Sequence, residues 1–162
     1  MNDNINITLS HSSISQAKSE LSKYKNKLDV KTRLIVEALL DYGRRYAQEQ
    51  LEQLGAVYTQ NLLSSIDTEL IGNVGFIFTE EEYAKYVEYG TGVVGRNNKH
   101  PQPPADWIYD VNEHGYEGWW YYNEADGKMH WTQGMVHRPF MYNTAKELKM
   151  KKNDIARGVL KE

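Results

Sequence analysis

The sequence predicts an α+β domain in which about four strands form a mainly antiparallel sheet, packed against a long N-terminal helix and a C-terminal helix. Changes of hydrophobic period predict this class. Apolar residues recur every three or four positions before Gly55 and again after Pro139, whereas they alternate in the segments at 61–78 and 119–132. At 162 residues the chain fits one domain, which we place at 13–162 behind a flexible, polar N-terminus at 1–12.

The N-terminal part predicts two successive helices. The first is capped by Ser13 or Ser15, and its apolar positions are Ile14, Ala17, Leu21, Tyr24 and Leu28. The second starts at Asp29, stops at Gly55 and carries a wide stripe made of Val36, Leu40, Gly43, Ala47, Leu51 and Leu54. A stripe this wide indicates core or subunit interface, and the small Gly43 and Ala47 leave room for a neighbouring element.

The period then changes to that of strands. We expect strands at 61–70 and 74–78, joined by a tight hairpin at Ile71–Asn73. Thr79 is a predicted N-cap, followed by three glutamates in the first turn of a short helix that runs through Tyr83, Tyr86 and Val87.

Gly90 and Gly92 are predicted to end this short helix, because glycine adopts left-handed backbone angles without steric cost. Thr91 lies between them and can bond the local backbone. The pattern is that of an ordinary helix C-cap. The same pattern is also typical of a site at which the backbone after the helix must adopt one defined position.

The region after Gly92 predicts a long irregular connection at 93–118, since His100–Pro104 contains three prolines that exclude helix and interior strand. A second hairpin follows, with strands at 119–122 and 128–132. The last helix starts at Arg138–Met141, where proline suits the first turn. Ten of the 19 aromatic residues lie between Trp107 and Tyr142, which favours a functional role for this loop and hairpin.

The charge distribution argues against a protein that grips nucleic acid. The net charge is −3, but residues 55–145 carry five basic and twelve acidic side chains, whereas phosphate binding needs a concentrated basic surface. Cysteine is absent, so neither disulfides nor thiolate metal sites are expected. No apolar run is long enough to span a membrane, and the first residues do not have the pattern of a signal peptide.

Three groups of residues are candidates for metal binding, glycoside hydrolysis or sugar binding. The histidines at 100, 114, 130 and 137 do not have the helical pair spacing of a zinc site, so we expect no metal and no cofactor. Glu113 with Glu117, or Glu124 with Asp126, has the composition of a glycosidase pair, but the second falls in a turn. Trp119–Tyr122 is a candidate sugar-stacking platform, although half of a strand's residues point inward. No catalytic motif is recognised, and we expect no enzyme.

Two runs of residues carry a resemblance to a known family. They are Tyr83-Ala84-Lys85-Tyr86-Val87-Glu88-Tyr89-Gly90-Thr91-Gly92 and Arg138-Pro139-Phe140-Met141-Tyr142-Asn143-Thr144-Ala145, preceded by Asn61–Ile66 and, before the second run, by Gly134-Met135. In this order and spacing, over about residues 30–150, the chain resembles the minor structural proteins of long-tailed bacteriophages and prophages, of the Hong Kong lambdoid-phage gene-product-ten type. It departs from them in its long aromatic segment at 93–133.

The resemblance implies a virion component of the neck or tail end, assembled in the bacterial cytoplasm, that forms a ring in head–tail joining or tail completion. Its expected partners are copies of itself, connector, stopper or tail-tube proteins, and double-stranded DNA that passes through without specific binding; no membrane is implied. The alternative is a carbohydrate-binding or hydrolytic module that uses Trp119–Trp131. The structural or interface candidates are Tyr86, Glu88, Gly90, Thr91, Gly92, Trp107, Trp119, Trp120, Trp131, Arg138, Pro139 and Phe140.

Overall fold

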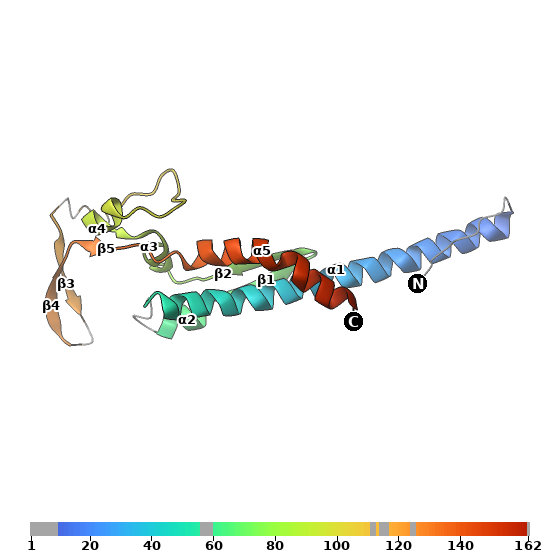
Figure 1. The fold of residues 1–162 in the computed structure, drawn as a ribbon, viewed down its shortest axis with the longest axis horizontal. Helices are drawn as coiled ribbons and strands as arrows, with labels where there is room; N and C mark the ends of the chain where they lie inside the picture. The colour runs from blue at the N-terminus through green and yellow to red at the C-terminus, as the bar shows by residue number, and fades with distance from the viewer. Residues whose placement is uncertain (1–9, 56–59, 111–112, 114–116, 124–125, 162) are drawn as a thin grey trace.

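The computed structural model describes residues 10–55, 60–110, 113, 117–123 and 126–161. It is elongated, with one long helix running along most of its length (Figure 1). The elements, in chain order, are α1 (His11–Gln53), α2 (Gln60–Ser65), β1 (Asp67–Ile71), β2 (Val74–Phe78), α3 (Ala84–Tyr89), α4 (Gly92–Asn97), β3 (Trp119–Asn123), β4 (Lys128–Thr132), β5 (Gly134–Met135) and α5 (Phe140–Lys161).

Helix α1 is one continuous helix, so the predicted break at Asp29 is wrong. Ser10 is the N-cap, in place of Ser13 or Ser15, and its hydroxyl accepts the Ser13 N–H at 3.2 Å. Asp29 is exposed, and neither glycine nor proline precedes Gly43 in the helix, so nothing stops propagation. The predicted end is confirmed, since Gly55 follows the cap with a φ of 61°.

The core lies where the C-terminal half of α1 meets α5, which runs antiparallel to it (Figure 1). Asn143 donates to Gln50 at 2.7 Å and Tyr42 donates to Glu147 at 3.0 Å, so the two helices are also joined by polar contacts. The buried cluster consists of Ala47, Leu51, Leu62, Ile66, Ala84, Val87 and Phe140. The stripe on α1 is therefore core, and its small residues do admit neighbours: a side chain at Gly43 would meet Ile77 and Leu148.

The strands form two separate two-stranded antiparallel sheets, so the predicted four-stranded sheet is wrong. Helices α3 and α4 lie between the two hairpins in the chain. The predicted first strand is also half wrong, because 60–65 is helical and only 67–71 is strand. Leu62 and Ile66, four residues apart, are both buried, which is the burial spacing of a helix.

The β1–β2 hairpin is confirmed, with Ile71 paired to Val74 around a turn in which Gly72 has a φ of 62°. Gly75 faces α1, where an added Cβ would lie 2.8 Å from Leu40, so glycine permits this close approach. The opposite face of the hairpin leaves Ile71, Val74 and Phe76 exposed.

Two predictions around α3 need correction. Thr79 does not cap the helix: its hydroxyl accepts the Glu81 N–H at 3.2 Å in the preceding turn, and α3 begins only at Ala84. The connection after Gly92 is not irregular throughout, because it begins with helix α4. The segment from His100 to Pro104 is irregular, as its prolines predict.

Within the residues that the structure describes, no helix has the length and apolar character needed to cross a bilayer. The predicted flexible segment falls mostly on residues 1–9, which lie outside the described ranges, as do His114 and Glu124.

Candidate functional site

The two sequence runs that carry the resemblance meet at Glu88. This side chain is 5% exposed, and its carboxylate accepts the backbone N–H groups of Met141 and Tyr142, each at 2.9 Å. These donors belong to the first turn of α5, whose N–H groups have no partner within the helix. A carboxylate from α3 thus caps α5 and meets the positive end of its dipole.

His100 completes the hydrogen bonds of Glu88. Its Nδ1 accepts the Gln102 N–H at 3.0 Å, so we assign the neutral tautomer with the proton on Nε2, which donates to Glu88 at 3.2 Å. The ring is 4% exposed and touches Tyr89 and Tyr142 edge to face. Burial, together with the Glu88 charge, raises the pKa of the Tyr89 hydroxyl.

Arg138 ties the start of α5 to two other elements. Its N–H donates to the Val87 carbonyl in α3 at 2.7 Å, and its guanidinium Nε donates to the Leu54 carbonyl at the end of α1 at 3.1 Å. Pro139 follows, and its carbonyl accepts the Asn143 N–H at 2.9 Å. Phe140 then enters the core at 1% exposure. This run therefore fixes where α5 begins.

The Gly90–Gly92 segment crosses β5 so closely that the two backbones are in direct contact. Thr91 and Gly92 bridge Met135 and Gly134, and the Thr91 hydroxyl accepts the Met135 N–H at 3.2 Å. Gly90, Gly92 and Gly134 all have positive φ, and a Cβ on any of them would strike the backbone of the other segment. The glycines are thus needed for close approach as well as for ending a helix.

Trp107 belongs to an aromatic cluster beside this crossing. Its ring centroid lies 5.0 Å from that of Tyr89 and 5.9 Å from that of Tyr86. Among the described residues, neither Trp107 Nε1 nor the Tyr109 hydroxyl, both buried, has a hydrogen-bond partner. Aromatic packing against α3 therefore holds this part of the irregular segment, together with the hydrogen bond from the Gly92 N–H to the Tyr109 carbonyl at 2.6 Å.

The β3–β4 hairpin projects from one end of the molecule (Figure 1). One of its faces carries exposed aromatic side chains. Trp120 pairs with Trp131 and Tyr122 with Met129 across the strands. Their exposed fractions are 60% for Trp120 and Tyr122, 55% for Met129 and 49% for Trp131. We call these four side chains the hairpin face. Near the turn, a hydrogen bond from His130 at 2.7 Å lowers the pKa of Asp126.

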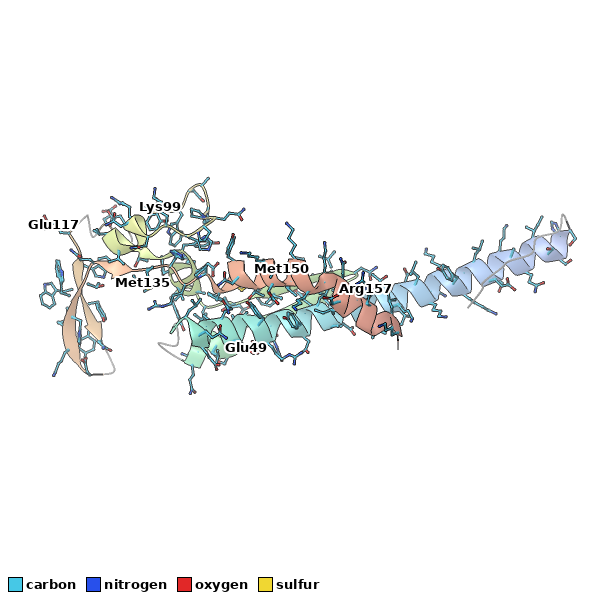
Figure 2. The ribbon with its side chains drawn as sticks, in the orientation of Figure 1. Glu49, Lys99, Glu117, Met135, Met150 and Arg157 are labelled. Atoms are coloured by element: carbon cyan, nitrogen blue, oxygen red, sulfur yellow. The ribbon has the colours of Figure 1, made fainter. Side chains whose placement is uncertain are left out.

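The other face of the hairpin turns toward the protein. Trp119 and Tyr121 are half-buried there and line a cleft of about 510 Å³ with Thr91, Val94, Thr132, Gly134, Met135, Val136 and Arg138. Figure 2 shows Met135 at the junction between the hairpin and the rest of the chain. Trp119 therefore lies next to the crossing, whereas Trp120 and Trp131 point away from it.

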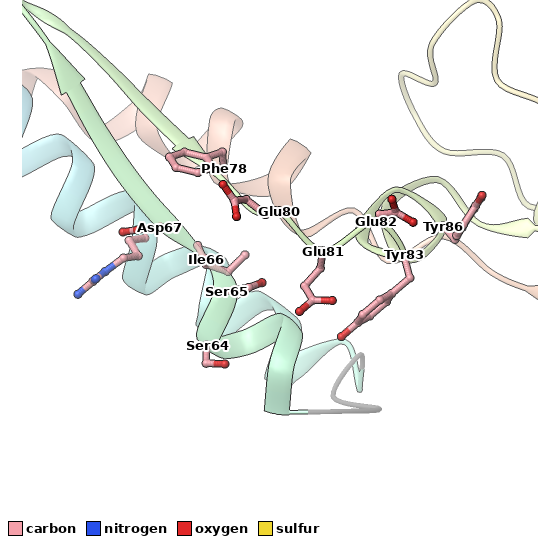
Figure 3. A pocket seen from close by; sticks show the side chains of 11 residues that line it. Ser64, Ser65, Ile66, Asp67, Phe78, Glu80, Glu81, Glu82, Tyr83 and Tyr86 are labelled. Carbon is pink, nitrogen blue, oxygen red and sulfur yellow. The ribbon is translucent and has the colours of Figure 1, made fainter. Parts of the chain in front are cut away.

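A larger hollow of about 880 Å³ lies between α2 and the segment before α3 (Figure 3). Asp67 and the three glutamates 80–82 line it, and Figure 3 shows Glu81 and Tyr83 extending toward the α2 side. These carboxylates are not arranged to hold a metal ion together, and no other group of three histidine, aspartate or glutamate side chains among the described residues is. Both ring nitrogens of His100 are occupied by hydrogen bonds, so this histidine is built into the junction.

The predicted residues thus divide into two sets. Nine come together at the junction of α3, β5 and α5, with Trp119 at its edge, and Trp120 and Trp131 belong to the hairpin face. Sequence reasoning missed His100 as the partner of Glu88, and it missed Gly134 as a contact residue. Gly134 belongs to the Gly134-Met135 pair of the resemblance, and that was its only signal in the sequence. Nothing in the spacing linked His100 to Glu88.

Comparisons with protein-family models, with curated proteins and with solved structures find no match for this chain.

Proposed function

We propose that the protein is a structural subunit of a tailed-phage particle, placed at the neck or tail end, where it forms a ring in head–tail joining or tail completion. The observation that carries the proposal is the exposed hairpin face, held on a junction whose contacts serve to fix backbone positions. Large exposed apolar patches on soluble proteins commonly mark partner surfaces.

The junction supports an assembly role because its polar groups bond to backbone. Glu88 binds the first turn of α5, and Arg138 binds the carbonyls of α3 and the end of α1. Side chains used in this way position elements and are not available to a substrate. The junction also fixes the position of β5, which directly follows the hairpin in the chain.

A ring also requires two different surfaces, since a heterologous contact repeated by rotation closes into a ring. The α1 stripe is excluded as one of them, because Ala47 and Leu51 are buried inside the subunit. The hairpin face supplies one surface. The outer face of β1–β2, with Ile71, Val74 and Phe76, supplies the second. The acidic stretch at 55–145 suits a channel that DNA passes without adhering to the wall.

The geometry disfavours the carbohydrate-binding alternative. The Trp120 and Trp131 rings meet at 65° with centroids 5.6 Å apart, so they do not form one flat platform for successive sugars. Sugar-dependent quenching of tryptophan fluorescence tests this alternative directly. A saturable change abolished by Trp120→Ala would favour it.

Trp120→Ala tests the proposed contact. We expect the variant to fold normally, because the indole is mostly exposed, but to lose about 2 kcal/mol of association free energy, as at interface hot spots. In a prophage whose own copy is replaced by this variant, electron microscopy should show full heads and tails that remain separate.

Met150→Ala is the matched control. Met150 is also 60% exposed, but it lies on α5 away from the hairpin (Figure 2). Particles with this change should assemble and infect normally. If particles with Trp120→Ala also assemble and infect normally, the hairpin face is not part of the assembly contact.

A further inference from the structure

The N-terminal part of α1 carries a second apolar surface, most of which the described residues leave exposed. Beyond the end of α5, no other described element packs against this helix (Figure 1). Near the end of α5, the Lys31 ammonium donates to the Leu160 carbonyl at 3.2 Å. An isolated helix of this length is marginally stable in water, and in proteins such helices depend on packing of an apolar face.

The apolar residues on this segment have coiled-coil spacing. Ile14, Ala17, Leu21, Tyr24 and Leu28 follow one another at alternating steps of three and four, which places them at successive a and d positions of a heptad. We call these five residues the α1 seam. Ile14, Leu21, Tyr24 and Leu28 are between 40% and 55% exposed, although all four are large and apolar. The small Ala17 is 6% exposed.

We propose that the α1 seam is the contact surface for the same helix of a second copy of this chain, in a parallel coiled coil. The α1 seam is a different surface from the hairpin face, and this inference stands whether or not the chain belongs to a phage particle.

The charges beside the seam select the orientation. In a parallel pair each g residue faces the e residue five positions later on the other helix. Glu20 is a g residue and Lys25 is an e residue, so the pair contains two Glu20–Lys25 contacts between opposite charges, one from each helix. The other g residues there, Ser13 and Lys27, face Lys18 and Thr32, which adds no repulsion. In an antiparallel pair, e residues face e residues and g residues face g residues. In the antiparallel alignment that pairs the most a and d residues, Lys18 faces Lys25 and Glu20 faces Lys27. The repulsion between the two lysines then offsets the attraction between Glu20 and Lys27.

Cysteine cross-linking tests both the contact and its orientation, and the chain lacks cysteine of its own. Tyr24 is 55% exposed and occupies a d position, so in a parallel pair its two copies face each other, within reach of a disulfide when both are cysteine. Purified full-length Tyr24→Cys should therefore give about tenfold more covalent dimer under mild oxidation than Ser19→Cys, which lies on the opposite side of the helix. Equal cross-linking at the two positions, or none at either, would overturn the proposal.

A charge in the seam gives the second test. Leu21→Asp should lower the sedimentation-derived mass of the full chain at a given concentration, whereas Val30→Asp should leave it unchanged. Val30 is equally exposed on α1 but lies off the seam, so it is the matched control. Circular dichroism would show that both variants keep the fold of the body. A wild-type chain that is monomeric at all concentrations, or that associates equally with Leu21→Asp, would contradict the parallel pair; the seam would then face a different protein or a membrane surface.

Discussion

Replacing Glu88 with alanine is expected to lower the free energy of unfolding by about 4 kcal/mol. The change leaves three donors without an acceptor: the N–H groups of Met141 and Tyr142, and His100 Nε2. Each buried unsatisfied donor costs about 1–3 kcal/mol. Because the same carboxylate caps α5, the start of that helix should also lose protection against amide hydrogen exchange.

Urea denaturation of the purified chain measures this loss. Glu37→Ala is the control, since Glu37 is an exposed glutamate paired with Arg33 on α1, and surface pairs of this kind contribute about 0.5 kcal/mol or less. Glu88→Gln keeps the shape and one oxygen acceptor, so its stability should fall between those of the wild type and Glu88→Ala. If Glu88→Ala and Glu37→Ala unfold at the same urea concentration, the junction does not depend on this carboxylate.

Gly92→Ala is expected to destabilise the fold by about 3 kcal/mol or more. Gly92 has a φ of 64°, and an added Cβ would strike the Gln133 carbonyl, so the variant combines a strained backbone with a backbone collision. Gly90→Ala should behave similarly, because its Cβ would lie 2.8 Å from the His137 N atom and the Met135 carbonyl.

Gly158→Ala on α5 separates this effect from the general consequence of replacing glycine. Apart from the neighbouring backbone of the helix itself, nothing described lies within 4 Å of an added Cβ at Gly158, so alanine should stabilise the helix by about 0.5–1 kcal/mol. Thermal unfolding should therefore move in opposite directions for Gly92→Ala and Gly158→Ala. Equal melting temperatures for wild type and Gly92→Ala would mean that Gly90–Gly92 does not need close approach to β5.

The parts of the fold that could be predicted from sequence are those with strong local signals. Gly72, Gly127 and the alternating residues beside them specify both hairpins, and Pro139 marks the start of α5. The sheet prediction failed because strand pairing beyond a hairpin depends on distant parts of the chain. The predicted strand at 61–70 failed in its first half because Leu62 and Ile66 suit either period over so short a run.

The junction was predictable in composition but not in geometry. Its two runs are recognisable in the sequence, yet the bonds from Glu88 to Met141 and Tyr142 cross more than fifty positions. The glycine pattern at 90–92 indicated a helix end. The structure adds a second reason for these glycines, because the backbone at Gly134 lies too close to leave room for a Cβ, and no local pattern predicts that contact. Alternation correctly predicted that one of Trp119 and Trp120 points outward, and the structure identifies it as Trp120.

Location of the protein in released particles tests the proposed function most directly. Prophages in the strain that encodes the chain would be induced, the particles purified by density gradient, and the protein detected by gold-labelled antibody in the electron microscope. The proposal predicts that the protein copurifies with the particles and that the label lies at the head–tail junction or the tail end. Protein that stays entirely in the particle-free fraction, while complete particles form, would contradict it.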